Sequence, residues 1–141
     1  MIVKFTVLGI PQTKQRPRAS VINGHARMYT PKDTVMYENL VRYAYQEQVG
    51  KKLDGAIEMH CKFYFPIPKS VSKKQRLLME TETVPHTKKP DVDNCVKSLT
   101  DGAQGVAFDD DKQIYKIVAE KYYSNIPRAE IELRTENEEK T

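Results

Sequence analysis

The chain has 141 residues, of which 39% are hydrophobic and 30% charged, a composition that indicates one soluble globular domain rather than a disordered chain. No apolar run reaches the roughly 18 residues of a membrane span and the N-terminus lacks the features of a signal peptide, so we expect a cytoplasmic protein. The net charge is +4, and two cysteines are too few for a disulfide framework. No acidic residue precedes Asp33, whereas six basic residues do, which favours an acidic partner such as nucleic acid.

The first predicted elements are a strand and a hairpin. Residues 2–10 are rich in Val, Ile, Phe and Thr, which predicts a strand. Residues 11–18 contain two prolines and are expected to form a loop. Two β-prone runs, 19–22 and 26–29, then flank Asn23-Gly24, which is a strong signal for a β-hairpin.

A long helix is predicted next. Thr30 can cap it, Pro31 suits its first position and Asp33 favours its positive end, while Gly50 is a suitable C-terminal glycine. The apolar residues that recur at helical spacing are Met36, Leu40, Tyr43 and Ala44.

The middle of the chain alternates between strand and helix patterns. Residues 56–66 alternate apolar and polar side chains, which predicts a second long strand. Ser72-Lys73-Lys74-Gln75 is a capping-box pattern and predicts a short basic helix that reaches Met79.

The last third contains one helix and two strands. Residues 90–103 form an amphipathic helical pattern whose apolar face is Val92, Val96, Leu99 and Ala103. Residues 113–123 and 128–133 are predicted strands. The element order predicts a single α+β domain over residues 1–141, with a mixed β-sheet and helices packed on it.

Acidic residues gather at two predicted boundaries of this basic chain. Asp91 and Asp93 lie at a helix start, and Asp109-Asp110-Asp111 precede a strand that we expect to bring a third carboxylate to the same point. Carboxylates converge when a cation lies among them, and Mg²⁺ prefers oxygen ligands. Lys97 lies one helical turn after Asp93, so the set fits phosphodiester hydrolysis. The alternatives are a helix cap, an ordinary ion pair and a solvated turn.

These residues carry a resemblance to a known family. Pro90-Asp91-Val92-Asp93-Asn94, Lys97, Asp101 and Asp110-Asp111-Lys112-Gln113-Ile114 resemble the pattern of the RusA family of Holliday junction resolvases, and the loop 14–18 is also similar. The resemblance implies a compact homodimer that cuts two opposed strands of a four-way DNA junction with Mg²⁺ or Mn²⁺, in DNA recombination and repair.

The resemblance also assigns roles by position. Asp91, Asp93 and Asp111 are implied to be catalytic and to hold the metal, Asp110 to be a neighbouring ligand with a lesser role, and Lys97 to be the catalytic lysine. Asp109 is a departure, because the family usually has a non-acidic residue there, and this leaves open which acid of the three faces the metal.

Branched DNA is the expected partner, and its phosphates require basic side chains. The candidates are Lys14, Arg16, Arg18, Arg27, Lys73, Lys74, Lys88 and Lys89. Two other functions compete with a nuclease: a non-catalytic dimer that binds DNA junctions in an architectural role, and a carboxylate-metal phosphoesterase that acts on small substrates.

Overall fold

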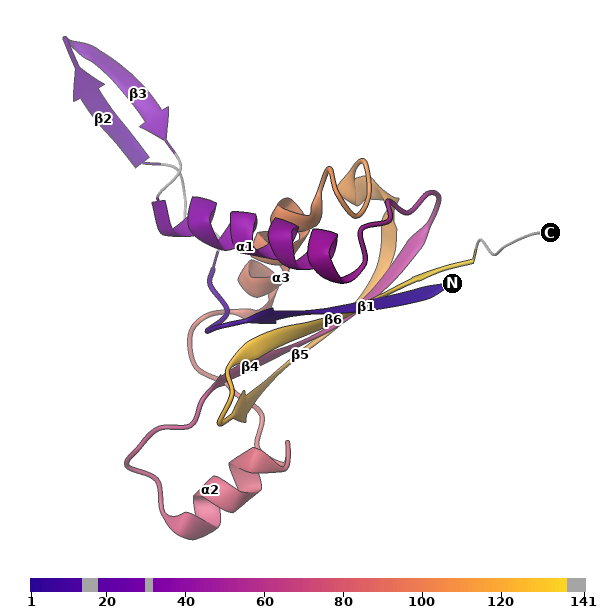
Figure 1. Ribbon diagram of the computed structural model, residues 1–141. Helices are drawn as coiled ribbons and strands as arrows, with labels where there is room; N and C mark the ends of the chain where they lie inside the picture. The colour runs from indigo at the N-terminus through magenta and orange to yellow at the C-terminus, as the bar shows by residue number, and fades with distance from the viewer. Residues whose placement is uncertain (14–17, 30–31, 137–141) are drawn as a thin grey trace.

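The computed structural model describes residues 1–13, 18–29 and 32–136 (Figure 1). The described residues form one α+β domain around a four-stranded mixed sheet of order β1-β6-β4-β5, in agreement with the predicted class. Its strands are β1 (Ile2–Leu8), β4 (Ile57–Pro66), β5 (Ile114–Ser124) and β6 (Arg128–Thr135). β5 runs parallel to β4, and the other neighbours are antiparallel.

Helices cover one face of this sheet. α1 (Lys32–Gln48) and α3 (Val92–Ala103) pack against each other there, whereas α2 (Lys73–Glu80) lies beyond one end of the sheet (Figure 1). The predicted hairpin is present as β2 (Arg18–Ile22) and β3 (His25–Tyr29), which stand away from the body. None of the helices in the described part of the chain is long and apolar enough to cross a bilayer.

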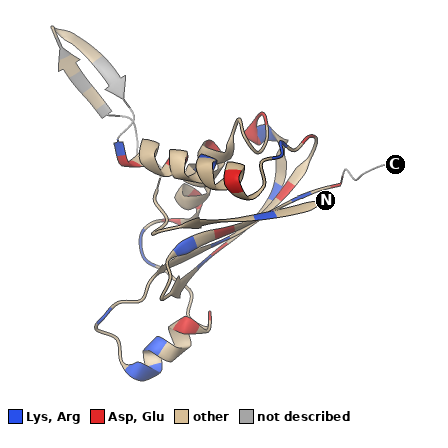
Figure 2. Cartoon of the chain, in the orientation of Figure 1, with Lys and Arg blue, Asp and Glu red and all other residues tan. Residues whose placement is uncertain are grey.

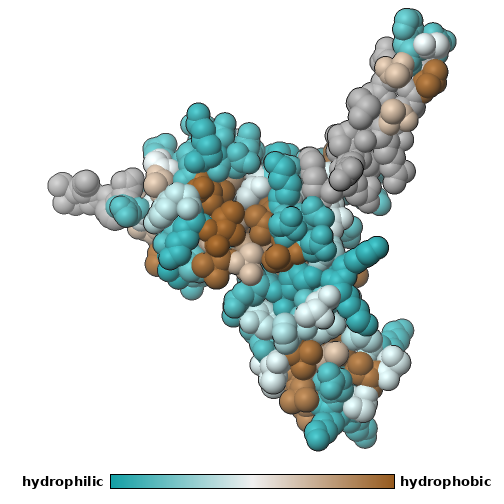
Figure 3. All heavy atoms as spheres, turned by 180° about the vertical axis from the view of Figure 1, so that it is seen from behind, coloured by the Kyte–Doolittle hydropathy of each residue, from teal (hydrophilic) through white to brown (hydrophobic). Residues whose placement is uncertain are grey.

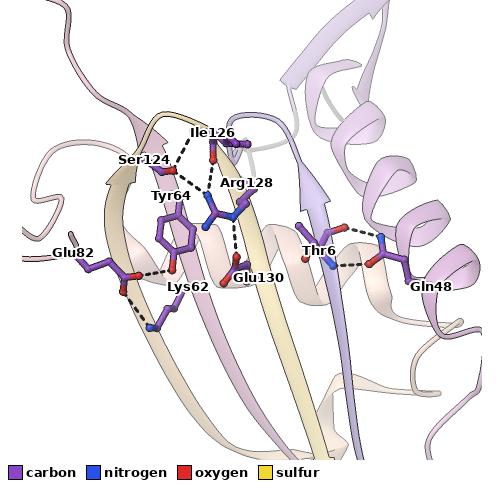
Figure 4. A network of polar contacts seen from close by, with 9 residues as sticks. All are labelled: Thr6, Gln48, Lys62, Tyr64, Glu82, Ser124, Ile126, Arg128 and Glu130. Carbon is purple, nitrogen blue, oxygen red and sulfur yellow. Dashed lines mark hydrogen bonds and ion pairs between the residues drawn. The ribbon is translucent and has the colours of Figure 1, made fainter. Parts of the chain in front are cut away.

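The core lies between the helices and the sheet. The alternation in β4 is confirmed, because Ile57, Met59, Cys61, Phe63 and Phe65 are all buried on the helix side. The opposite face of the sheet carries charged and polar residues, and many of them form ion pairs (Figures 2 and 4). Arg134 of β6 pairs with Glu58 of β4, whereas Arg128 pairs with Glu130 on the same strand.

Helix α1 buries a different stripe from the one its spacing suggested. Met36, Leu40 and Tyr43 are 58%, 41% and 61% exposed, whereas Tyr37 and Val41 are buried. Both stripes repeat at helical spacing, so the sequence of α1 alone does not choose between them. The choice is made by α3, which packs on Val41. The predicted cap at Thr30 and Pro31 lies outside the described residues.

Helix α3 approaches α1 so closely that only glycine fits at the contact. A Cβ on Gly102 would lie 2.7 Å from the Cβ of Val41 and 2.9 Å from the backbone oxygen of Glu38. Leu99 and Ala103 are buried as expected, but Val92 is 38% exposed. The buried face is rotated toward α1 and includes the small side chains Cys95 and Ser98, which permit the close approach.

Candidate active site

Asp91 and Asp93 lie at the start of α3. Asp91 is the N-cap residue, with extended backbone angles (φ −69°, ψ 150°), and its side chain makes no capping hydrogen bond. Asp93 lies in the first turn, and both side chains are exposed. The backbone at Asp91 is thus extended, and its carboxylate is not used for capping.

Lys121 of β5 holds the segment that leads into Asp91. Its Nζ donates hydrogen bonds to the backbone oxygens of Lys88, at 2.7 Å, and of Pro90. The backbone oxygen of Lys121 accepts a hydrogen bond from the backbone N–H of His86 at 3.0 Å. One residue of the sheet thus fixes both ends of segment 86–90, and with it the position of Asp91. Lys121 has no signal in the sequence, because its partners are backbone atoms far away in the chain.

The two aspartates open onto a hollow of about 490 Å³, here called the α3 hollow. Its walls come from the start of α3, from the segment before it and from the end of β5: Pro85, His86, Asp91, Val92, Asp93, Ala119, Glu120, Lys121 and Tyr122. Glu120 adds a third carboxylate to the rim, and it too has no signal in the sequence. The hollow therefore combines acidic groups with the positive helix end and one fixed ammonium.

His86 forms the buried wall of the α3 hollow. It is 9% exposed and stacks on Phe65, with ring centroids 4.2 Å apart, and it packs on Tyr123 at 4.9 Å. Burial lowers the pKa of His86 below its usual value, and the charge of Lys121 lowers it further, so the imidazole is neutral at pH 7. The neutral ring therefore packs against the rings of Phe65 and Tyr123, and this packing supports segment 86–90.

Lys97 follows Asp93 by one helical turn, as predicted, and its side chain is 55% exposed. Its Nζ forms an ion pair with a carboxylate oxygen of Asp101 at 3.3 Å, on the side away from the helix start. The ammonium is thus held on the helix surface by the residue one turn further on.

Cys95, one turn inside α3, lies close enough to sense these charges. Burial raises its pKa to about 11, and Asp91 and Asp93 contribute in the same direction against Lys121. Cys95 is therefore a neutral thiol at pH 7. It is buried and free of any disulfide, as is Cys61.

The acidic turn 109–111 is built around Gln113. The side-chain oxygen of Gln113 accepts hydrogen bonds from the backbone N–H groups of Asp109 and Asp110, at 3.0 and 3.2 Å. Its amide nitrogen donates to the backbone oxygens of Leu53 and Gly55. The Asp-Asp-x-Gln motif therefore anchors this turn to the loop before β4.

The three consecutive acids have different environments. Asp109 forms an ion pair with Lys52 at 2.8 Å. Asp110 caps the short 3-10 helix η1 (Asp111–Gln113) by accepting a hydrogen bond from the backbone N–H of Lys112. Among the described residues, only the side chain of Asp111 has no polar partner of the three, which leaves its carboxylate available for a ligand.

One chain does not bring the acidic turn to the α3 hollow. Asp111 precedes the start of β5, whereas Asp91 is fixed beside Lys121, so the two are separated by most of the strand, or about 23 Å at roughly 3.3 Å per residue. In the part of the chain that the structure describes, no three His, Cys, Asp or Glu residues are grouped as they would be around a metal ion. The expected convergence of a third carboxylate from this turn is therefore not seen within one chain.

The basic residues expected to bind DNA fall into two regions. Lys14 and Arg16 lie outside the described residues. Arg18 and Arg27 belong to the hairpin strands β2 and β3, and their side chains lie outside what the structure describes.

The other four basic candidates lie on the body. Lys73 and Lys74 are exposed in the first turn of α2, which carries basic residues beyond the sheet (Figure 2). Lys88 and Lys89 are exposed on the segment before Asp91, and they line a second hollow on the other side of that segment. Lys88 and Lys89 are thus the basic residues next to the aspartate pair.

Comparison with known proteins gave two matches. The sequence model of the family described as Endodeoxyribonuclease RusA matches residues 9–134. The chain is also similar to the uncharacterized protein YqaN of Bacillus subtilis (strain 168), with 37% identity over 135 residues that cover 94% of this chain and 95% of YqaN.

Proposed function

Because this chain belongs to the RusA endodeoxyribonuclease family, we propose that it resolves four-way DNA junctions by Mg²⁺-dependent phosphodiester hydrolysis. The observation that carries this proposal is the pair Asp91 and Asp93, which lie exposed at the positive end of α3 and are not used for capping. A protein that only bound DNA would gain affinity by lacking these negative charges, because they repel phosphates. The pair therefore supports a catalytic role over an architectural one.

The donor set fits the proposed metal. Mg²⁺ is commonly bound by one or two carboxylates together with substrate phosphates, and it keeps part of its water shell. Asp91 and Asp93 would hold it, and Asp111 and Asp110 remain proposed ligands from the acidic turn. Mn²⁺ would be an alternative ion. A bound ion would supply an activated water and would neutralise charge on the scissile phosphate.

The remaining residues of the site bind and orient the DNA. Lys88 and Lys89 are placed to neutralise phosphates next to the aspartates. Lys97 brings a positive charge to the outer surface of α3, where it can stabilise negative charge that develops in the transition state. Lys121 keeps Asp91 in place through the backbone of segment 88–90.

Two opposed strands of a junction must be cut in concert, which one site cannot do. We therefore propose a homodimer that carries two such sites, acting in DNA recombination and repair.

The test is cleavage of a labelled four-way junction beside a linear duplex of the same arm sequence, with and without Mg²⁺. We expect paired symmetric cuts in the junction only. Asp93→Asn should abolish cleavage while junction binding stays equal or becomes tighter. Asp109→Asn is the matched control, because it changes an acid that is ion-paired with Lys52. Tight binding without cuts in any divalent metal would favour the architectural function, and hydrolysis of a chromogenic phosphodiester without DNA cleavage would favour a small-substrate phosphoesterase.

A further inference from the structure

The second hollow, of about 510 Å³, lies on the other side of segment 86–90 from the aspartate pair. It forms where the body of the protein joins the lobe that carries α2. Residues 67–72 and 81–91 connect the body and this lobe, and the surface of the connection is largely hydrophilic when it is seen from behind (Figure 3). The volume of the second hollow is in the range of sites that enclose a small molecule or one group of a larger ligand.

The floor of the second hollow is apolar and fixed in place. Phe65 and Tyr123 are paired neighbours on the parallel strands β4 and β5, and His86 stacks on Phe65 with ring centroids 4.2 Å apart. The walls add four prolines, which lack a backbone N–H and have a fixed φ: Pro11, Pro66, Pro68 and Pro90. The second hollow is therefore preformed and offers mainly flat apolar contact.

The charges beside segment 86–90 are divided between its two sides. Asp91, Asp93 and Glu120 line the α3 hollow. Among the described residues, no acid lines the second hollow, whereas Lys88 and Lys89 do. Both lysines are exposed, and neither side chain has an ion pair or a hydrogen bond with the described part of the chain. The second hollow thus combines an apolar floor with a positive rim.

This combination matches the chemistry of a nucleotide in a DNA strand. Unpaired bases stack on flat apolar side chains, and the adjoining phosphates bind lysines. An inorganic anion would gain nothing from the apolar floor, and an apolar molecule would gain nothing from the lysines. Pro90 of the second hollow directly precedes Asp91 in the chain. A strand whose phosphate lies at the aspartate pair therefore has its neighbouring nucleotide within reach of the second hollow.

We propose that the second hollow holds one base of the cleaved DNA strand, unstacked from its neighbours, next to the scissile phosphate. This rests on the proposed function, which places that phosphate at Asp91 and Asp93. Moving a base out of the stack costs least where stacking is already interrupted. The branch point of a four-way junction interrupts the stacking of the strands that cross it, whereas every base inside a linear duplex is stacked on both sides. The second hollow therefore helps to select the branch point over duplex DNA.

The first test measures base unstacking without cleavage. The fluorescent adenine analogue 2-aminopurine, whose emission rises when it leaves the stack, is placed at each branch-point nucleotide in turn, and the protein is added without divalent metal. We expect a rise at one nucleotide of each cleaved strand. Gln12→Trp should abolish the rise at saturating protein, because the exposed side chain of Gln12 lines the second hollow and an indole there fills it.

Gln46→Trp is the matched control, since it makes the same change at an exposed position of α1 outside the second hollow and should retain the rise. Circular dichroism checks the folding of each variant, and Ile10→Trp on the same rim replaces Gln12→Trp if that variant does not fold. A bound junction with no rise at any nucleotide, or an equal rise with wild type and Gln12→Trp, would overturn the proposal.

The second test removes the base instead of filling the second hollow. Gln12→Trp should slow junction cleavage on the order of tenfold, because stacking of one base is lost. On a junction that lacks the base at the nucleotide found by fluorescence, wild type and Gln12→Trp should cleave at equal rates, because no base then enters the second hollow. A Gln12→Trp defect that persists on this abasic junction would contradict the base site.

Failure of the base site and failure of the proposed function give different results. Junction cleavage without any change in fluorescence would overturn the base site and leave the nuclease function in place. A rise that Gln12→Trp abolishes, without cleavage in any divalent metal, would retain the second hollow as a base-binding site and overturn the nuclease function.

Discussion

Lys121→Met is the change that most directly tests how the sheet positions the proposed active site. It keeps the length of the side chain and removes the ammonium that bonds to the backbone oxygens of Lys88 and Pro90. A hydrogen bond from a charged group contributes roughly 1.5–3 kcal/mol when buried. Lys121 is only partly buried, so we expect the two bonds together to contribute about 2 kcal/mol to the free energy of unfolding.

The effect on cleavage should exceed the effect on stability. Released from Lys121, segment 88–90 would let Asp91 move, and a misplacement of about 1 Å can cost on the order of 100-fold in rate. The measurement is the single-turnover rate of junction cleavage at saturating enzyme, alongside urea unfolding. Lys121→Arg retains donors for both carbonyls and should recover much of the rate.

Lys62→Met is the matched control. Lys62 lies on β4 and forms an exposed ion pair with Glu82 at 3.2 Å, which is worth about 0–1 kcal/mol, so both rate and stability should stay near wild type. A Lys121→Met rate within twofold of wild type at unchanged DNA affinity would refute the positioning role. A loss confined to DNA affinity would show instead that Lys121 binds phosphate.

Three other changes test separate parts of the structure. Gly102→Ala should lower the free energy of unfolding by about 1–3 kcal/mol despite the better helix propensity of alanine, because the new Cβ meets Val41; urea unfolding measures this, and a neutral result would contradict the close packing. Asp111→Asn should abolish junction cleavage on a sequencing gel, whereas Asp109→Asn should not, and the reverse order would reassign the ligand. Lys97→Ala should reduce single-turnover cleavage with little change in junction affinity; a change in affinity alone would make Lys97 a phosphate-binding residue.

Local signals in the sequence were sufficient for most of the fold. The Asn23-Gly24 hairpin is present, and Ser72 caps α2 by accepting a hydrogen bond from the Gln75 N–H at 3.1 Å. The alternation in β4 also identified its buried face. Each of these features depends on residues within a few positions of one another, which is why a single sequence can reveal it.

Features that depend on distant pairings could not be predicted in the same way. The buried stripe of α1 follows from the contact between Val41 and Gly102, and the role of Lys121 follows from β5 running parallel to β4. That same topology places Asp111 and Asp91 at opposite ends of β5. The aspartate pattern was enough to identify the family. It carried no information about the distance between Asp91 and Asp111 within one chain.

The uncapped start of α3 has a consequence for engineering this protein. An aspartate at an N-cap normally accepts a backbone N–H, and such a bond contributes about 1 kcal/mol, yet the side chain of Asp91 makes none. A serine at this position would supply the bond and would relieve the repulsion with Asp93. Selection for thermal stability alone is thus expected to favour loss of Asp91. In variants chosen for a high melting temperature, position 91 should therefore be sequenced and junction cleavage should be measured before any other property.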